Sequence, residues 1–135
     1  MTSGIVIAAI VATKNRPELL ANRSLASVAA QTRPPDFLII VDDSAPKNRT
    51  LNEQIAAEFS SPGTTVVYLG NYRTAGASGA WNTALAWLHM HASDACAAIL
   101  DDDDAWSPAY LERCEQVAID DNLDMVVAGL LYHRS

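Results

Sequence analysis

Short apolar segments alternate with helix-like segments along the whole chain, and this alternation limits the fold more than any other feature. The apolar segments are rich in β-branched residues and are bounded by polar or turn-forming residues, which is typical of buried strands. They span residues 4–12, 37–41, 64–69, 95–100 and 125–131.

Helices are expected between these strands. The first covers residues 17–31 and starts with a proline, which suits the first turn of a helix. Thr50 and Glu53 have the spacing of a capping box at the start of the second. Two more are expected around residues 81–89 and 108–119. Strands that alternate with helices form parallel sheets with right-handed crossovers. The sequence therefore predicts an α/β fold, a mostly parallel sheet with helices on both faces.

The chain has the size and composition of one folded domain, residues 1–135. A chain of 135 residues can bury about two-thirds of its unfolded surface, and half of these residues are hydrophobic. There is no signal-peptide pattern and no apolar stretch of about 20 residues that could cross a bilayer. Cys96 and Cys114 are far apart and are expected to be buried free thiols in a reducing compartment. Together these features predict a cytoplasmic protein without a membrane span.

The negative charge is concentrated in the second half of the chain. Residues 1–73 carry seven basic and six acidic side chains, whereas residues 74–135 carry two basic and ten acidic ones. An acidic surface of this kind argues against binding to nucleic-acid phosphates. It suits the binding of a cation.

Polar residues follow each expected strand, and parallel strands end at the same edge of a sheet. Four aspartates, residues 101–104, follow one strand, and Asp42 and Asp43 follow another. Residues 13–16 (Thr-Lys-Asn-Arg) and a glycine-bearing loop, residues 70–79, follow two more. Clustered carboxylates repel one another unless a cation neutralises them, and oxygen ligands favour Mg²⁺ or Mn²⁺. The edge therefore matches a nucleotide diphosphate bound through a divalent cation.

Each of these groups also has a purely structural interpretation. The four aspartates could form a solvated turn before the helix near residue 108, and Arg16 could be a solvated cation. Gly76 and Gly79 could only permit close packing of a helix start. The remaining candidates could cap helices, namely Thr13, Asn15, Asp42 and Asp43.

Four motifs resemble the family-2 inverting glycosyltransferases, which have the Rossmann-like GT-A fold. They are VATKNRPELL at residues 11–20, IIVDDS at 39–44, GASGAWN at 76–82 and ILDDDDAWSP at 99–108. The last resembles the Asp-x-Asp metal signature of the family. The four motifs occur in the family's order and cover almost the whole chain.

The resemblance implies a role for each candidate residue. Asp43, together with Asp42, would accept a uracil-type N–H, and Asp102 would face the ribose. Asp103 would hold the Mn²⁺ or Mg²⁺ that bridges the diphosphate, with Asp101 and Asp104 completing the metal site. The other residues expected beside the nucleotide are Thr13, Asn15, Arg16, Arg73, Gly76 and Gly79.

The chain departs from the family in two ways. Trp81 stands where the family usually has arginine; we interpret it as a packing residue, with Arg73 as the nearest cationic substitute. Members of the family also continue into a second half that binds the acceptor and supplies the catalytic carboxylate. The acidic residues of the last helix-to-strand connection, Asp120, Asp121 and Asp124, are expected at the opposite edge of the sheet. The catalytic base is therefore expected outside these 135 residues.

The resemblance implies a donor-binding domain that takes a nucleotide-diphosphate sugar, with UDP favoured, for inverting transfer to a saccharide or other hydroxyl acceptor. By itself the chain is expected to bind donor and metal without transfer, and to self-associate or pair with an acceptor half. A sugar-nucleotide nucleotidyltransferase is an alternative, but residues 13–16 lack the glycine that its loop needs. A Mg²⁺-dependent phosphoacceptor signalling module is another alternative. Such a module needs a lysine after its last strand, and no lysine follows Lys47 in this chain.

Overall fold

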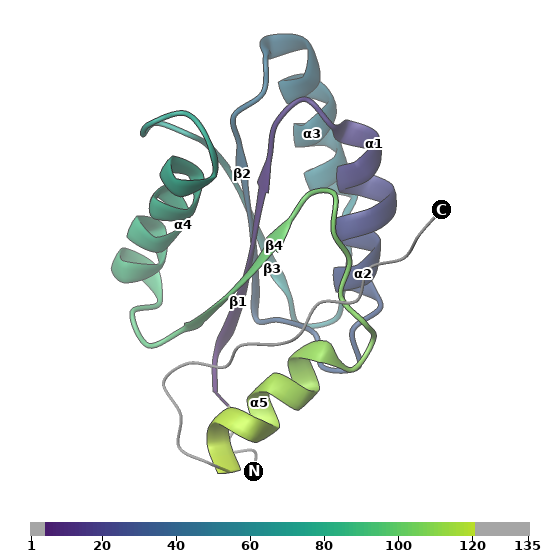
Figure 1. Ribbon diagram of the computed structural model, residues 1–135, viewed down its shortest axis with the longest axis vertical. Helices are drawn as coiled ribbons and strands as arrows, with labels where there is room; N and C mark the ends of the chain where they lie inside the picture. Colours follow the sequence, from purple (N-terminus) through teal and green to yellow (C-terminus); the bar gives the residue numbers. More distant parts are fainter. Residues whose placement is uncertain (1–4, 121–135) are drawn as a thin grey trace.

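A four-stranded parallel sheet forms the centre of the protein. The computed structural model describes residues 5–120. Within them the strands are β1 (Ile7–Thr13), β2 (Phe37–Asp42), β3 (Thr65–Gly70) and β4 (Cys96–Asp101), in the order β3-β2-β1-β4 (Figure 1). All three pairings are parallel, so the α/β prediction is confirmed. The strand expected at residues 125–131 lies outside the described residues.

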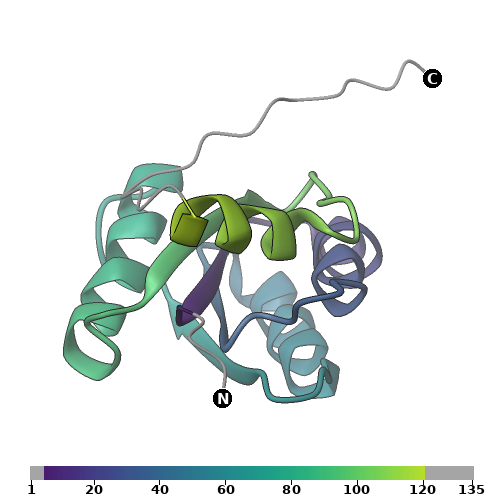
Figure 2. The same cartoon turned by 90° about the horizontal axis from the view of Figure 1, so that it is seen from below.

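Helices cover both faces of this sheet (Figures 1 and 2). On one face lie α3 (Pro46–Glu58) and a continuous helical segment made of α1 (Pro17–Leu19), a π-helical turn η1 (Leu20–Ser24) and α2 (Leu25–Ala29). The other face carries α4 (Ala77–His91). The last described helix, α5 (Tyr110–Asp120), lies at the end of the sheet where the chain begins (Figure 1).

The two central strands are buried on both faces because alternate side chains enter different cores. Ala9 and Val11 of β1 pack with Leu25, Val28 and other residues beneath α2 and α3. Their neighbours in the sequence, Ala8 and Ile10, pack on the opposite face with Ala84 and Leu88 of α4. This packing on both sides fixes the sheet, and with it the place where each strand ends.

Two sequence-based expectations about local structure are wrong. The helix expected at a Thr50 capping box begins earlier, at Pro46, because a proline suits the first helical position. The Thr50 hydroxyl instead donates to the Pro46 carbonyl one turn back within the helix.

The second concerns β4, which is much less buried than its apolar sequence predicts. Among the described residues it pairs only with β1, so within residues 5–120 it is the outermost strand on its side of the sheet. Ile99 is 43% exposed, Cys96 is exposed and Cys114 is partly exposed. Both cysteines are free thiols, and neither is buried as the sequence predicts.

Candidate functional site

The polar residues that follow the strands meet at one edge of the sheet, as the sequence predicts. The register pairs Thr13 at the end of β1 with Asp42 of β2, and Ala12 with Asp101 of β4. Four loops that are far apart in the sequence are therefore gathered at the carboxyl ends of the strands. In open α/β sheets this edge is where ligands bind.

Three of the four consecutive aspartates point toward a common space. Carboxylate oxygens of Asp101, Asp103 and Asp104 all lie within 4.8 Å of one another, and all three residues are exposed. Hard oxygen ligands of this kind can hold Mg²⁺ or Mn²⁺. The structure thus brings together the three aspartates proposed as metal ligands, which we call the acidic triad.

Asp102 differs from its neighbours because it is buried, at 5% exposure. Its Oδ2 accepts hydrogen bonds from the hydroxyl of Thr13 over 3.0 Å and from the backbone N–H of Lys14 over 3.3 Å. These two donors fasten the aspartate loop to the end of β1. Asp102 therefore has a structural partner on one oxygen, while Oδ1 lies 3.6 Å from Nη1 of Arg16.

Arg16 adds positive charge beside the acidic triad. Its Nη1 lies 3.1 Å from Oδ2 of Asp103, and its side chain is half-exposed. Partial burial raises the pKa of Asp101, and the negative charges of Asp104, Asp103 and Asp102 raise it further. The charge of the triad is thus only partly compensated within the protein. A divalent cation would relieve the remaining repulsion.

The two aspartates after β2 have different surroundings. Asp42 is fully buried: its Oδ1 accepts from the N–H of Ser44, and its Oδ2 accepts from the Tyr68 hydroxyl and from Nδ2 of Asn52. Burial and the hydrogen bond to Asp42 raise the pKa of Tyr68. Since its oxygens are already used inside the protein, Asp42 is poorly placed to accept a nucleobase N–H.

Asp43 is partly exposed and faces the glycine-bearing loop. Its Oδ2 accepts a hydrogen bond from the N–H of Gly76 over 2.9 Å. Within residues 5–120, its other oxygen has no protein donor. Asp43 therefore both holds the loop after β3 and keeps one acceptor for a ligand. Neither aspartate caps α3, whose first turn has no side-chain cap.

Asn15 uses its polar groups to join two loops. Its backbone is in the left-handed region, at φ 55°, and its N–H donates to Oγ of Ser44 over 2.7 Å. Its Oδ1 accepts from the N–H of Ala45 and from Nδ2 of Asn48. Asn15 therefore shapes the site by joining these two loops. The interpretation of Thr13 and Asn15 as caps of the first helix is wrong, since Arg16 occupies that position without a side-chain bond.

The loop after β3 folds tightly against the start of α4. Gly76 has φ 108°, which glycine adopts easily. A Cβ on Gly79 would stand 1.7 Å from the carbonyl oxygen of Thr74, so only glycine fits. The guanidinium of Arg73 lies over the exposed ring of Tyr72 at 5.2 Å from its centroid. Trp81 packs against the core beneath α4, which confirms its interpretation as a packing residue.

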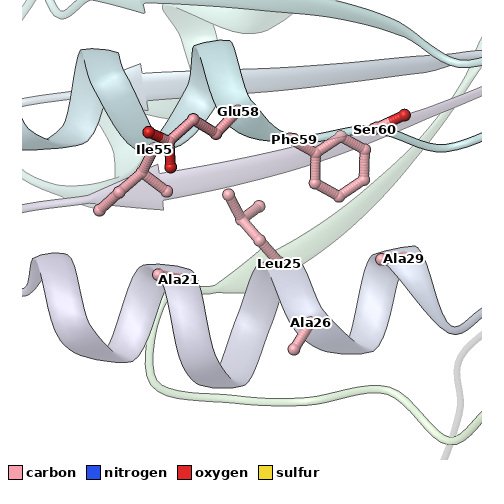
Figure 3. A pocket seen from close by; sticks show the side chains of 8 residues that line it. All are labelled: Ala21, Leu25, Ala26, Ala29, Ile55, Glu58, Phe59 and Ser60. Carbon is pink, nitrogen blue, oxygen red and sulfur yellow. The ribbon is translucent and has the colours of Figure 1, made fainter.

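Asn52, Tyr68 and Ser44 were not predicted as part of the site, although they support Asp42. The sequence holds a weak signal for one of them, because Asn52 is polar at a helix position that faces the sheet. A separate shallow hollow of about 290 Å³ lies between α2 and α3 and is lined mainly by apolar residues (Figure 3). It contains none of the residues at the polar edge. No helix within residues 5–120 has the length and apolar character needed to cross a membrane.

Comparison with known proteins identifies the family to which the chain belongs. Residues 8–135 match the model of glycosyl transferase family 2. Over 96 residues the chain is 40% identical to galactofuranosyltransferase GlfT1 of Mycobacterium tuberculosis (strain ATCC 25618 / H37Rv), an alignment that covers 71% of this chain and 29% of the relative. Over 105 residues it is 41% identical to GlfT1 of Mycolicibacterium smegmatis (strain ATCC 700084 / mc(2)155), covering 77% and 32%. The chain thus spans about a third of the length of these relatives.

A solved structure shares the fold. The crystal structure of S. aureus TarS superposes with a TM-score of 0.63 at 18% identity, covering 87% of this chain and 20% of that one. At this level of identity the likeness concerns the architecture alone.

Proposed function

The chain belongs to glycosyl transferase family 2, and we propose that its polar sheet edge is the donor site of a glycosyltransferase, where a nucleotide-diphosphate sugar binds together with a divalent cation. The observation that carries this proposal is the convergence of Asp101, Asp103 and Asp104 beside Arg16. Three carboxylates suit Mn²⁺ or Mg²⁺, and the guanidinium suits a phosphate oxygen.

The residues of this chain would divide the work of donor binding. Asp101, Asp103 and Asp104 would hold the cation, which supplies charge stabilisation for the departing diphosphate. Arg16 would add a second positive group at the phosphates. Oδ1 of Asp102 is the oxygen left for a ribose hydroxyl, and the free oxygen of Asp43 is left for the N–H of a uracil-type base.

The donor sugar and the acceptor belong to the same proposal. UDP is favoured because a carboxylate acceptor such as Asp43 suits the N–H of uracil. The relatives are named galactofuranosyltransferases, so a galactofuranosyl donor is the first sugar to test. The reaction proposed is inverting transfer to a hydroxyl of a saccharide or similar acceptor, in a protein without nucleic-acid partners and with a cytoplasmic location.

The catalytic base is proposed to lie outside these 135 residues. Among the described residues, the aspartates at this edge are either metal-ligand candidates or, in Asp42, Asp43 and Asp102, accept hydrogen bonds from the protein, and the second oxygen of Asp43 is assigned to the nucleobase. A cation lowers the proton affinity of the carboxylates that it binds. The proposal is that the chain alone binds the donor without transferring sugar. Its exposed apolar side chains near β4, such as Ile99, are expected to pair with an acceptor half or a second copy.

Calorimetry with UDP, GDP, CDP and dTDP, each with and without Mn²⁺, tests the proposal. We expect UDP to bind most tightly and Mn²⁺ to increase its affinity. Asp103→Ala should abolish this metal-dependent part, and Asp101→Ala should reduce it less. Asp94→Ala is the charge-matched control. Asp94 is exposed in the turn before β4, at the amino-terminal ends of the strands and away from the polar site. An unchanged response to Mn²⁺ in Asp103→Ala would contradict the metal site.

A further inference from the structure

A line of buried and partly buried hydrogen bonds runs behind the donor site, from β3 to the turn after β1. The hydroxyl of Tyr68 donates to Oδ2 of Asp42 over 2.6 Å, and Nδ2 of Asn52 donates to the same oxygen over 3.1 Å. Nδ2 of Asn52 also lies 3.2 Å from Oγ of Ser44, which accepts the N–H of Asn15 over 2.7 Å. The line therefore ends at the residue before Arg16.

The turn at its end has a backbone that needs support. Asn15 has a positive φ of 55°, a conformation that is unfavourable for most L-residues and that asparagine tolerates better than most. The bond to Ser44 supports this conformation, together with the two bonds that Oδ1 of Asn15 accepts from Ala45 and Asn48. The same turn presents the N–H of Lys14 to Asp102 and the guanidinium of Arg16 to Asp103. The line of hydrogen bonds thus reaches the turn that carries Arg16.

One polar atom in the line lacks a partner within residues 5–120. Asn52 is fully buried, and within the described residues its Oδ1 has no hydrogen-bond partner. A buried polar atom left unpaired destabilises a fold, and an apolar side chain on the core side of α3 would avoid this. The orientation of the Asn52 amide is nevertheless fixed. If the amide were flipped, its Oδ1 would face the carboxylate of Asp42, and two acceptors would repel each other. The side chain is explained by what it holds, namely Asp42 and Ser44.

We infer that Tyr68 and Asn52 are positioning residues for donor binding: through Asp42, Ser44 and Asn15 they hold Arg16 beside the acidic triad, where it meets the diphosphate. This inference rests on the proposed donor site. Neither residue touches the ligand. Their effect should therefore appear in the phosphate part of binding, and it should disappear when Arg16 itself is removed.

Tyr68→Phe tests the inference because it keeps the ring and removes only the hydroxyl. Its matched control is Thr64→Val. Thr64 immediately precedes β3, and the substitution removes the hydrogen bond that its hydroxyl donates to the carbonyl of Pro35. Both variants should be less stable. Under conditions where both remain folded, Tyr68→Phe should weaken Mn²⁺–UDP and Mn²⁺–pyrophosphate binding by about fivefold to tenfold, whereas Thr64→Val should bind both like the parent chain.

A double-mutant cycle separates positioning from general destabilisation. In an Arg16→Ala background, Tyr68→Phe should cause almost no further loss of affinity. Asn52→Leu, which replaces the amide with an apolar group of similar size, should behave in the same way. Equal losses of affinity with and without Arg16 would overturn the inference.

A measurement without ligand keeps the inference separate from the proposed function. Amide hydrogen exchange at Asn15 and Lys14, followed by NMR, should become faster in Tyr68→Phe and stay unchanged in Thr64→Val. If the parent chain binds no nucleotide while this difference is present, the proposed function fails and the positioning of the turn stands. If exchange at both amides is the same in all chains, the positioning role is wrong.

Discussion

The hydroxyl of Thr13 donates a 3.0 Å hydrogen bond to Oδ2 of Asp102, a residue 89 positions later in the chain. Both side chains are buried. This bond joins the end of β1 to the loop after β4 and turns the second of four consecutive aspartates inward. As a result, Asp101, Asp103 and Asp104 remain exposed and face one another.

The first prediction concerns this bond. Thr13→Val keeps the shape of the side chain but removes the donor, so a buried carboxylate loses one of its partners. The free energy of unfolding should fall by about 1.5–3 kcal/mol, measured by urea denaturation. Thr50→Val is the control, because the Thr50 hydroxyl is exposed and bonds only within its own helix; it should change stability by at most about 0.5 kcal/mol. Equal losses in the two variants would show that the bond is unimportant.

A second prediction follows from the raised pKa of Asp101. Burial and the three neighbouring aspartates disfavour its charged form in the folded chain. Between the ordinary carboxylate range and this raised pKa, the folded state binds more protons than the unfolded state. The stability of the metal-free protein should therefore fall as pH rises through this window. Asp101→Asn should reduce this slope and be more stable than the parent chain at neutral pH.

The same substitution should weaken the response to metal, since it removes a ligand candidate. Mn²⁺ should raise the thermal midpoint of Asp101→Asn less than that of the parent chain, whereas Asp94→Asn, at the other edge, should respond like the parent. A parent chain whose stability does not change with pH in this window, or an Asp101→Asn variant less stable than the parent at neutral pH, would contradict the electrostatic argument.

Asp43 gives the third prediction. Asp43→Ala removes the acceptor proposed for the base, so UDP binding should weaken by about 10- to 100-fold while Mn²⁺–pyrophosphate binding stays nearly unchanged. Asp43→Asn is the control for the loop, because its remaining oxygen can still accept the N–H of Gly76. We expect Asp43→Asn to keep the loop but bind UDP more weakly than the parent, in calorimetry. Equal losses for UDP and pyrophosphate in Asp43→Ala would mean that Asp43 acts only by holding the loop.

The fourth prediction concerns the glycine in the first turn of α4. Alanine normally stabilises a helix by about 1 kcal/mol relative to glycine. At Gly79 the added Cβ would meet the Thr74 carbonyl at 1.7 Å, so the loop must move. Gly79→Ala should therefore lower the free energy of unfolding by about 1–3 kcal/mol. Gly70→Ala is the control, because nothing lies within 4 Å of its added Cβ. A Gly79→Ala variant as stable as Gly70→Ala would show that the loop is not packed in this way.

Much of the fold and the place of the site could be predicted from the sequence, because these depend on local patterns. Apolar runs with β-branched residues predict the strands, and their alternation with helices requires a parallel sheet. In a parallel sheet the carboxyl ends of all strands lie on the same side. The residues around 13–16, 42–43 and 101–104, which follow three of these strands, therefore had to meet there. Their chemical types then predict a site for a cation and a diphosphate.

Only the tertiary structure decided what each polar residue does at that edge. Asp42 and Asp43 are neighbours with the same side chain, yet Asp42 is fully buried against Tyr68 and Asn52, while one oxygen of Asp43 accepts no hydrogen bond from residues 5–120. Asp102 is likewise separated from the acidic triad by its bond to Thr13. The sequence cannot distinguish such neighbours, because successive residues at a strand end point in different directions. Which direction is buried depends on side chains that reach the site from distant parts of the chain.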